Sequence, residues 1–494
     1  MEQLGRVARK EGFVVIPLSG EWRLKGNRSF YHEYNLYPKH NVQKAIDEAH
    51  SKIFLKDGTH TLNTALSVQK SNFQIEGESH AAVLSLNNAT MSGIVFGDPA
   101  YVTPYENVQI RNLKVDSAVT KSAGSGIEFR AIQEVGALRP SLSGVFNVLI
   151  ENQYDGLVLS ACTGFYVKNV NVFYSVNTGT KIYNTCNAIH LTNIEIDGCK
   201  TEAYGTSKGI YLAKTIELWM TNVHITRSTV GLYIYGASTM LLGSIFINGL
   251  MASDNKDFGV QIWLTDTSTV SGIYFTNSMF ATNGMLYTPY SGARGVCISS
   301  SSTGAVEGFY FSQCDFFQNG GHGFYASGGT DFRFTGCTFV NNGKQSNNAY
   351  SGAYFEAGVS NFQFVGNKFF SGVRGDVSMQ AYGVYIVTGA SNYYIITDNE
   401  FKGNNLGAIY NGASGAERIV RNNRGYVTEN SGTSTGTGAE QTIPHGLATG
   451  LTPNLVTVIP TVTGATVSGV WADATNIYCT VTSGKAFKWS ASVV

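Results

Sequence analysis

A six-residue pattern of apolar and polar positions recurs along the middle of the chain. Each copy reads apolar, polar, turn-forming, apolar or small, polar and apolar. The copies begin at Ile110, Val167, Leu191, Met220, Ile247, Phe275, Phe311, Phe334, Phe364 and Ile396. Copies about 30 residues apart indicate one supersecondary unit per repeat, stacked on its neighbours. The pattern therefore predicts a solenoid.

The third position of the pattern predicts a sharp bend, because its residues tolerate a left-handed backbone. These residues are Asn169, Asn193, Asn222, Gly249, Asn277, Gln313, Gly336, Gly366 and Asp398. The fourth and sixth positions are apolar or small and alternate with polar residues, the period of a half-buried strand. The late sixth positions predict an internal aromatic stack of Phe280, Phe316, Phe339, Phe369 and Phe401.

A second pattern, glycine-apolar-any-apolar, follows the copies and predicts a third strand in each repeat. It begins at Gly126, Gly156, Ala188, Gly209, Gly231, Gly259, Gly295, Gly323, Gly352, Gly383 and Gly407. Three short strands per repeat predict an all-β fold, a parallel β-helix of about twelve coils. Helical spacing is found near residues 42–50, where Asn41 is the expected N-cap.

Residues 45–77, AIDEAHSKIFLKDGTHTLNTALSVQKSNFQIEG, carry a family resemblance. This stretch resembles the entry into the right-handed parallel β-helix of the pectin-lyase-like superfamily, especially bacteriophage tailspikes. The resemblance implies a short amphipathic helix that caps the first coil, and with the coil repeats it extends over residues 42–425. Because the superfamily includes lyases, hydrolases, epimerases and adhesins, it implies a fold more strongly than an activity.

The composition changes at both ends of the repeats and predicts four segments. These are an N-terminal aromatic cap (residues 1–41), the β-helix (42–427), a linker (428–442) and a small all-β module (443–494). The linker reads TENSGTSTGTGAEQ and has no apolar period. The last segment resembles C-terminal modules of phage tail fibres and spikes, which implies trimer assembly or glycan binding. We expect the aromatic cap to pack on the first coil or on a neighbouring subunit.

Composition and charge exclude several classes of protein. The 494 residues are 43% hydrophobic and 14% charged, and the formal net charge is zero. The hydrophobic content excludes a disordered chain, and the balanced charge argues against binding to nucleic acid or to a membrane surface. The chain has no apolar run of membrane-spanning length, and its start lacks the order of a secretory signal. A virion tail or an extracellular location is expected.

The resemblance implies a sugar-binding face on the glycine-led strand. The outward column two places after each glycine holds Tyr211, Tyr233, Gln261, Cys297, Tyr325, Tyr354 and Tyr385, preceded by His190. The next outward column holds Tyr235, Trp263 and Glu356. Exposed aromatic rings pack against the C–H groups of a pyranose, so the columns favour sugar binding. The alternative is an interface between subunits of a trimer.

The candidate catalytic groups lie beside two of these strands. Asp254 and Asp257 precede Gly259, Asp266 follows Trp263, and Arg294 precedes Gly295. Two carboxylates could act as general acid and base in glycoside hydrolysis. In a lyase, a Tyr, Lys or Arg would remove the proton beside a uronate while a cation neutralises its carboxylate. The alternative is that they are solvated turn residues.

A second candidate cluster lies on another face. Glu195 and His224 occupy the same outward column in consecutive coils, and Asp197 points the same way, about 6.5 to 7 Å from Glu195 along the strand. The pair fits a glycosidase loosely, and a surface ladder is the alternative. The sequence has no calcium-binding nonapeptide array and predicts no metal or cofactor. A single calcium ion bound by carboxylates would leave no signal of this kind.

Together these observations predict a tailspike-like polysaccharide depolymerase, a homotrimer that cleaves a bacterial surface or matrix glycan by hydrolysis or β-elimination. One alternative is a receptor-binding spike without enzymatic activity. Another is a free polysaccharide lyase that acts on alginate or pectin. The tripeptide Gly321-His322-Gly323 resembles a motif of polygalacturonases, but their accompanying motifs are missing. His322 is therefore expected to be a turn residue.

Overall fold

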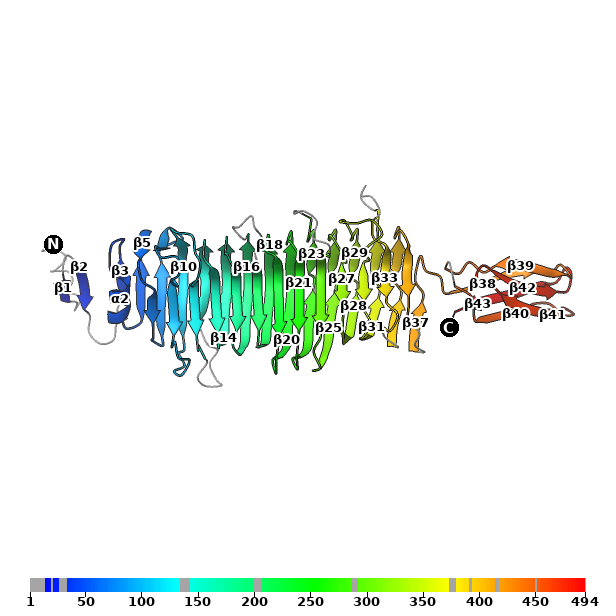
Figure 1. Ribbon diagram of the computed structural model, residues 1–494, viewed down its shortest axis with the longest axis horizontal. Helices are drawn as coiled ribbons and strands as arrows, with labels where there is room; N and C mark the ends of the chain where they lie inside the picture. Colours follow the sequence, from blue (N-terminus) through cyan, green and yellow to red (C-terminus); the bar gives the residue numbers. More distant parts are fainter. Residues whose placement is uncertain are drawn as a thin grey trace. The chain divides into compact units, whose positions relative to one another are not determined.

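The structure is a computed structural model that divides into two compact units. Unit 1 comprises Met1–Ser278 with Ser302–Ala305, and unit 2 comprises Met279–Ser301 with Val306–Val494. The structure describes residues 14–18, 21–25, 33–133, 143–198, 207–285, 292–372, 379–390, 393–413, 417–448 and 451–493. Of residues 14–25 and 33–34, only the backbone is described. Figure 1 shows the strands in sequence colours.

Unit 1 consists of coils of a parallel β-helix, and one of its faces is a sheet that contains the glycine-led strands. Successive strands of this sheet pair in parallel with their equivalents in the next coil. The sheet is formed by β6 (Leu66–Val68), β9 (Ile94–Gly97), β11 (Ser125–Arg130), β13 (Asp155–Ser160), β15 (Thr178–Tyr183), β17 (Lys208–Ala213), β19 (Val230–Gly236) and β21 (Phe258–Leu264). We call it the glycine-led sheet.

The remaining coil strands of unit 1 include those that carry the six-residue pattern. They are β3 (Glu33–Leu36), β4 (Lys52–Leu55), β5 (Gly58–Leu62), β7 (Phe73–Gly77), β8 (Ala82–Leu86), β10 (Val108–Ser117), β12 (Gly144–Glu151), β14 (Thr163–Phe173), β16 (Cys186–Asp197), β18 (Thr215–Thr226), β20 (Leu241–Ser253) and β22 (Thr269–Thr276). The bend at its third position is confirmed, because Asn169, Asn193 and Asn222 have φ of 55°, 54° and 52°. Asn193 Nδ2 donates to Asn169 Oδ1 over 2.9 Å, so the bends stack as an amide ladder.

The N-terminal end of the coils in unit 1 is capped by the one short helix expected there, α2 (Val42–Glu48). Asn41 Oδ1 accepts from Lys44 N over 2.9 Å, as an N-cap does, and Val42, Ala45 and Ile46 are buried. Before it, β1 (Val14–Leu18) and β2 (Glu21–Lys25) form an antiparallel pair. The expected packing of the N-terminal aromatic side chains lies largely outside the described residues. No helix in the described part of the chain is long and apolar enough to cross a membrane.

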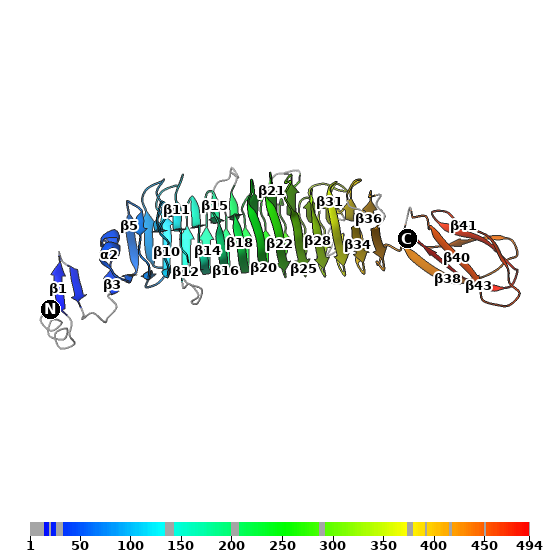
Figure 2. The ribbon, with the colours of Figure 1, turned by 90° about the horizontal axis from the view of Figure 1, so that it is seen from below.

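In unit 2 each coil has three short strands, as the repeat predicts. Figure 2 shows several of these strands. The glycine-led strands are β24 (Arg294–Ser300), β27 (Phe324–Ala326), β30 (Ala353–Phe355), β33 (Tyr382–Ile386) and β36 (Gly407–Asn411). The strands before the bend are β25 (Val306–Ser312), β28 (Gly329–Thr335), β31 (Val359–Val365), β34 (Tyr393–Thr397) and β37 (Glu417–Arg421). Those after it are β23 (Met279–Ala281), β26 (Asp315–Phe317), β29 (Thr338–Val340), β32 (Lys368–Phe370) and β35 (Glu400–Lys402).

The internal phenylalanine stack of unit 2 is confirmed. Ring centres of Phe280 and Phe316 lie 5.0 Å apart, and those of Phe316 and Phe339 lie 4.4 Å apart. The stack continues from Phe339 to Phe369 at 4.6 Å and on to Phe401 at 4.9 Å. In-register parallel pairing places identical side chains one above another, so each ring covers the face of the next.

Buried amide ladders, which the sequence analysis did not identify, run beside this stack. Asn367 Nδ2 donates to Asn399 Oδ1, and Asn399 Nδ2 donates to Asn423 Oδ1, both over 3.0 Å. Asn399 Nδ2 also donates to the backbone oxygen of Phe364 over 3.0 Å. A carboxamide can donate and accept at once, so it satisfies its own buried polar atoms while linking consecutive coils.

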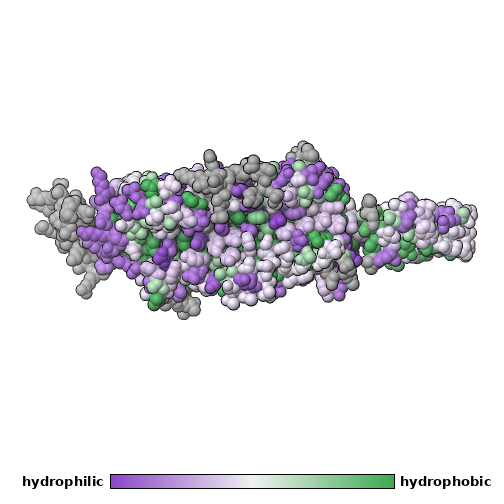
Figure 3. Space-filling view, in the orientation of Figure 1, coloured by the Kyte–Doolittle hydropathy of each residue, from purple (hydrophilic) through white to green (hydrophobic). Residues whose placement is uncertain are grey.

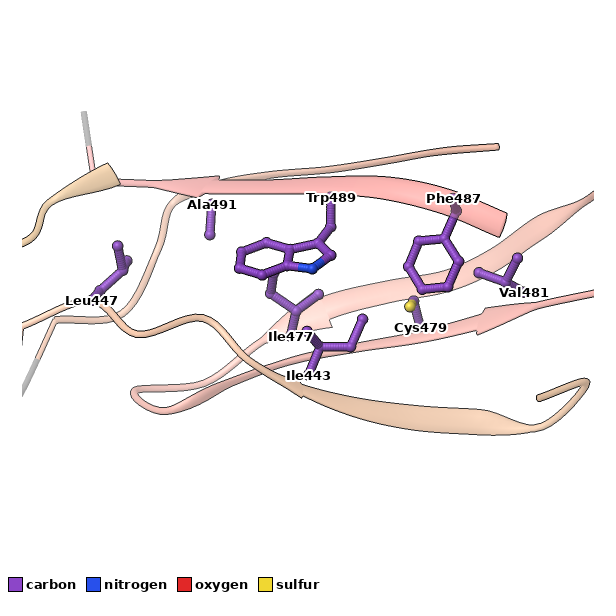
Figure 4. Packing of buried hydrophobic residues seen from close by; sticks show 8 residues of the cluster. All are labelled: Ile443, Leu447, Ile477, Cys479, Val481, Phe487, Trp489 and Ala491. Atoms are coloured by element: carbon purple, nitrogen blue, oxygen red, sulfur yellow. The ribbon is translucent and has the colours of Figure 1, made fainter. Parts of the chain in front are cut away.

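A small antiparallel module forms the C-terminal part of unit 2, as expected. One three-stranded sheet has the order β38 (Glu429–Thr435), β43 (Ala486–Ser492), β40 (Leu455–Pro460), and the other the order β39 (Glu440–Pro444), β42 (Asn476–Val481), β41 (Val467–Ala472). Figure 4 shows its buried core, which consists of Ile443, Leu447, Ile477, Cys479, Val481, Phe487, Trp489 and Ala491. The alternation of apolar and polar residues along these strands explains the core.

The linker expected at residues 428–442 is wrong, because most of this segment is strand. β38 pairs with β43 from Glu429 opposite Ser492 to Thr435 opposite Ala486, and β39 begins at Glu440. Backbone groups supply these hydrogen bonds whatever the side chains are, and threonine suits strands. The ring of Trp489 lies against Gly432, where a side chain would collide with it. The segment therefore shows no apolar period although it is ordered.

Hydrophobic residues are scattered over the surface in small patches among polar ones, on the face that Figure 3 shows.

Candidate functional site

The predicted outward columns of the glycine-led strands are confirmed within each unit. In unit 1, Tyr211 lies opposite Tyr233, and Tyr235 lies opposite Trp263. In unit 2 the column continues through Cys297, Tyr325, Tyr354 and Tyr385, each paired with the next. Inward neighbours such as Leu232 and Ile234 are fully buried. The alternation of the strands therefore places the aromatic rings on the outer face.

One member of the predicted column, His190, lies elsewhere. It belongs to β16, where its ring stacks between Tyr166 at 4.7 Å and Trp219 at 4.6 Å. The assignment was wrong because Ala188 occupies a left-handed bend, with φ of 51°, and does not begin a glycine-led strand. The glycine-led strand of this coil is β15, which contains Gly179.

The tyrosines and the tryptophan of unit 1 line an open groove of about 420 Å³. Its lining consists of Lys208, Tyr211, Tyr233, Tyr235, Trp263 and Thr265. We call it the aromatic groove. The groove lies over neighbouring strands of the glycine-led sheet. Its lining includes Lys208, which begins β17, and Thr265, which follows the last residue of β21. Lys208 and Thr265 were not singled out from the sequence, since neither belongs to an aromatic column.

Among the rings of the groove, Trp263 is exposed and the three tyrosines are half-buried. The rings of Tyr211 and Tyr233 are tilted by 36° with centres 5.7 Å apart, and those of Tyr233 and Tyr235 lie 6.1 Å apart. Trp263 is 47% exposed, and no described aromatic ring stacks on it. An indole face that is bare and held in a concave surface can pack against an apolar ligand face.

The electrostatics of the groove favour binding over tyrosine-based proton abstraction. Burial raises the pKa of Tyr233 to about 12, with smaller contributions from the neighbouring Tyr211 and Tyr235 hydroxyls. Burial also raises the pKa of Tyr211. The raised pKa makes the tyrosinate form, which would act as the base, harder to reach. Lys208 Nζ lies 5.3 Å from the centre of the Tyr233 ring and adds positive charge to this surface.

Asp257 precedes β21 at the edge of the sheet where Lys208 begins β17, and it is not among the residues that line the groove. It directly precedes β21, whose first residue Phe258 pairs with Val230, and Val230 pairs with Lys208. Its Oδ1 is buried and has no hydrogen-bond partner. Burial raises the pKa of the Asp257 carboxyl, and the charge of Lys256 opposes the shift. A carboxyl whose pKa is raised by burial is suited to act as a general acid.

Asp254 and Asp266 occupy turns on either side of this strand. Asp254 has φ of 55°, between β20 and β21. Asp266 has φ of 57°, its Oδ2 accepts from Ser238 N over 3.1 Å, and its backbone oxygen accepts from Thr303 N over 2.7 Å. These contacts fix the turn that leaves β21.

The structure does not bring Asp257 and Asp266 together. β21 has seven residues and separates them. At about 3.3 Å per residue the strand spans about 20 Å. The paired carboxylates of a glycosidase are at most about 9.5 Å apart. These two carboxyls therefore do not form an acid–base pair on one glycosidic bond.

Arg294 contacts two residues of its own unit, Tyr325 and Cys297. Its guanidinium carbon lies 3.7 Å from the centre of the Tyr325 ring, and Nη1 donates to Cys297 Sγ over 3.1 Å. Tyr325 Oη donates to Glu356 Oε1 over 3.4 Å. Tyr325 and Tyr354 are stacked 5.7 Å apart. Arg294 thus contacts Tyr325, which is stacked on Tyr354 and bonded to Glu356.

His322 packs beneath this cluster and is buried. Its ring lies 4.5 Å from that of Tyr354, and Nδ1 accepts from Ser351 N over 3.0 Å. Burial, with a smaller contribution from the positive charge of Arg294, lowers the pKa of His322 to about 3. The imidazole is therefore neutral at pH 7 and supports the rings above it. The sequence did not predict that His322 is buried, because it lies between two glycines and not in an alternating apolar pattern.

The second candidate cluster is partly assembled. Glu195 pairs in register with His224, as expected, and His224 Nε2 is buried without a hydrogen-bond partner. Asp197, in contrast, forms a salt bridge with Arg227. This ion pair uses the carboxylate that would complete an acid–base pair with Glu195. In the described part of the chain, no three His, Cys, Asp or Glu side chains are grouped so that they could hold a metal ion.

Comparison with known proteins supports the fold. Residues 208–396 match a family model described as a right handed beta helix region. The chain is thus a right-handed parallel β-helix over this range. A search of curated protein sequences found no match.

Solved structures with a similar fold include enzymes and a phage protein. The A-module of mannuronan C-5 epimerase AlgE4 from Azotobacter vinelandii is 14% identical, with a TM-score of 0.44 over 77% of this chain and 94% of that chain. The catalytic domain of a GH87 alpha-1,3-glucanase in complex with nigerose is 12% identical, with a TM-score of 0.49 over 81% and 70%. The Dettilon tailspike protein is 11% identical, with a TM-score of 0.44 over 92% and 94%. These likenesses concern the fold.

Proposed function

We propose that this protein is a tailspike-like depolymerase that binds a bacterial surface or matrix polysaccharide in the aromatic groove and cleaves it there. The observation that supports binding most directly is the groove itself, an open surface in which Trp263 and three tyrosines stand beside Lys208. Sugar C–H groups carry slight positive charge and pack on the electron-rich face of an aromatic ring. A bare indole face is therefore a platform for one sugar residue.

The charge of the groove favours an acidic polysaccharide. Lys208 Nζ lies over Tyr233, and Lys181 Nζ lies 5.9 Å from the centre of the Tyr211 ring. Lys208, Tyr211, Tyr233, Tyr235, Trp263 and Thr265 line the groove, and none of them is acidic. A carboxylate or sulfate on the glycan would be attracted to the two ammonium groups.

For cleavage we assign the general acid to Asp257. Its raised pKa keeps a larger fraction of the carboxyl protonated near neutral pH, as proton donation to a leaving sugar oxygen requires. The tyrosines are unsuited to β-elimination because burial raises the pKa of their hydroxyls. We therefore favour hydrolysis over a lyase reaction on alginate or pectin.

The proposal includes assembly as a homotrimer on a virion tail or outside the cell. It is supported by the resemblance of the C-terminal module to modules of phage spikes. Light scattering should return three times the 53.3 kDa mass of one chain. A mass of one chain at micromolar concentration would contradict it.

The proposal is tested with a panel of bacterial capsular polysaccharides, alginate and pectin, using two readouts on each. A hydrolase releases reducing ends, whereas a lyase also creates an unsaturated uronate that absorbs in the ultraviolet. For the glycan that is cleaved, Asp257→Asn should lower kcat by about 10² to 10⁴. Glu307→Gln, at an exposed carboxyl on β25 in unit 2, is the matched control and should retain turnover.

Each of the remaining outcomes would favour one of the alternative functions. Binding without any cleavage, lost in Trp263→Ala, would leave the groove as the binding surface of a non-enzymatic receptor-binding spike. Full turnover by Asp257→Asn would exclude Asp257 and direct attention to Glu195 and His224. If ultraviolet absorption increases at the same rate as the wild type cleaves the chains, the protein is a lyase.

A further inference from the structure

The C-terminal module carries a pair of aromatic rings on the outer face of the sheet β39-β42-β41. Trp471 on β41 and Tyr478 on β42 pair in register. Their ring centres are 3.8 Å apart and their planes differ by 7°, so the rings are stacked face to face. The side chains that alternate with Tyr478 on β42, Ile477 and Cys479, are fully buried. The stacked pair is therefore on the side of the sheet away from the core.

One face of the Trp471 indole is open. Tyr478 covers one face of the indole, yet 49% of Trp471 is exposed. β41 is also an edge strand of this described sheet. The exposed area must therefore come from the opposite face and the outer edge of the indole, which provide a flat apolar surface.

Hydrogen bonds fix the orientation of both rings. Trp471 Nε1 donates to Glu440 Oε2 over 3.3 Å, and Tyr478 Oη donates to Asp473 Oδ2 over 2.8 Å. Asp473 Oδ1 in turn accepts from the backbone of Thr475 over 2.8 Å and of Asn476 over 2.7 Å. These bonds hold the pKa of Asp473 well below its usual range. A platform that is already ordered loses little entropy when a ligand packs on it.

The residues around the pair are polar. By strand register, Thr442 lies opposite Tyr478, and Thr480 lies opposite both Glu440 and Ser468. The fully buried centre of a protein–protein interface is more apolar than this and depleted in charge. One aromatic platform bordered by hydroxyls and carboxylates instead suits a ligand with an apolar face and many hydroxyl groups.

We propose that Trp471 and Tyr478 form a second carbohydrate-binding site, whose ligand is a neutral, pyranose-containing polysaccharide. The sugar ring packs on the open indole face, and its hydroxyls donate to the carboxylates of Glu440 and Asp473. Two acidic side chains border the rings, so an anionic sugar is repelled, in contrast to the lysine-bearing groove. The proposal does not depend on the groove, since its residues all belong to the module.

The test is affinity electrophoresis of the full chain in native gels that contain dextran, soluble starch, galactomannan or hydroxyethyl cellulose. At least one of these neutral polymers should retard the wild type. Trp471→Ala should weaken that retardation about tenfold or more, as loss of a central tryptophan does. Val470→Ala, the neighbouring exposed residue that is not aromatic, is the matched control and should be retarded like the wild type.

Three results would overturn the assignment. The first is that none of the four polymers retards the wild type. The second is that Trp471→Ala is retarded as much as the wild type. The third is that sedimentation shows a changed oligomeric state in Trp471→Ala, which would mean that the rings mediate self-association. Trp263→Ala separates this site from the groove. It should retain retardation by the neutral polymer even if the groove proves not to bind glycan. Near-ultraviolet circular dichroism and thermal melting check that each variant is folded.

Discussion

The aromatic groove of unit 1 and the tyrosine row of unit 2 arise from the same sequence pattern and differ in what the rings can do. In unit 2, Tyr354, Tyr385 and Tyr410 are stacked with centres 4.9 and 4.3 Å apart and planes within 13°. We call them the tyrosine ladder. In unit 1 the rings are tilted or spaced, and Trp263 has a bare face. A column of aromatic residues therefore predicts a binding surface only where ring faces stay uncovered.

The cause of the difference lies in the order of residues along each column. Consecutive coils of unit 2 place tyrosine at the same register position, so equal side chains adopt equal rotamers and stack. In unit 1, Gln261 follows Tyr233 and interrupts the column, while Trp263 stands in the next column beside Tyr235. The interruption leaves room between rings, and a ligand can enter there.

The largest effect is expected where rings stack inside the coils. Phe339→Ala should lower the free energy of unfolding by about 3 to 5 kcal/mol, because the cavity left between Phe316 and Phe369 cannot collapse in coils held by their neighbours. Denaturant unfolding monitored by circular dichroism measures the change. A melting profile equal to that of the wild type would show that stacking contributes little, and the comparison would lose its energetic basis.

The second prediction contrasts one open ring with one covered ring. Trp263→Ala should weaken glycan binding by about 10- to 30-fold with little change in the melting temperature, because the indole is 47% exposed and no described aromatic ring stacks on it. Tyr410→Ala removes a ring that is also exposed, at 39%, but is stacked on Tyr385, and binding should be unchanged. Isothermal calorimetry with the bound glycan measures both. Equal losses would mean that exposure alone, and not an open face, determines binding.

The third prediction concerns the ladder itself. Tyr385 is stacked between Tyr354 and Tyr410, and Tyr385→Ala should cost about 1 kcal/mol of stability through the lost aromatic pairs. Glycan binding should be unaffected. Thermal unfolding of this variant beside Tyr410→Ala, which loses fewer partners, gives the measurement. A loss of binding in Tyr385→Ala with the fold intact would make the ladder a binding surface as well.

The sequence was a good guide wherever one residue type repeats in register. The left-handed bends at Asn169 and Asn193 and the stacked ring of Phe339 follow from columns that each coil repeats. The groove was only partly predictable. Lys208 lies at the start of β17 and lines the groove because its side chain is long. The predicted pairing of Asp257 with Asp266 was wrong because the two residues lie at opposite ends of an extended seven-residue strand. They are close in sequence and far apart in space.

Features that depend on single contacts had no periodic signal. The burial of His322 depends on the packing of Tyr354 and Ser351 against it. Strand β38 was missed because its pairing with β43 uses backbone groups and its side chains are mostly exposed. Trp471 does not belong to a column of residues that repeats from coil to coil, so the repeat pattern did not predict its role.

The smallest expected effect is a pH dependence of stability in the coils beneath the tyrosine ladder. Burial lowers the pKa of His322 to about 3 in the folded chain, from an ordinary value of 6.5. The unfolded chain therefore binds a proton at a pH where the folded chain does not, and the stability from neutral His322 is fully present above pH 6.5 and is lost as the pH falls below it. Between pH 7.5 and 6 the loss should be less than about 1 kcal/mol. Thermal unfolding across this range measures it, with His322→Asn as the comparison, since that variant should have a flatter profile whatever its absolute stability. If both proteins show the same slope, another group titrates, and the rings above His322 do not depend on its neutral form.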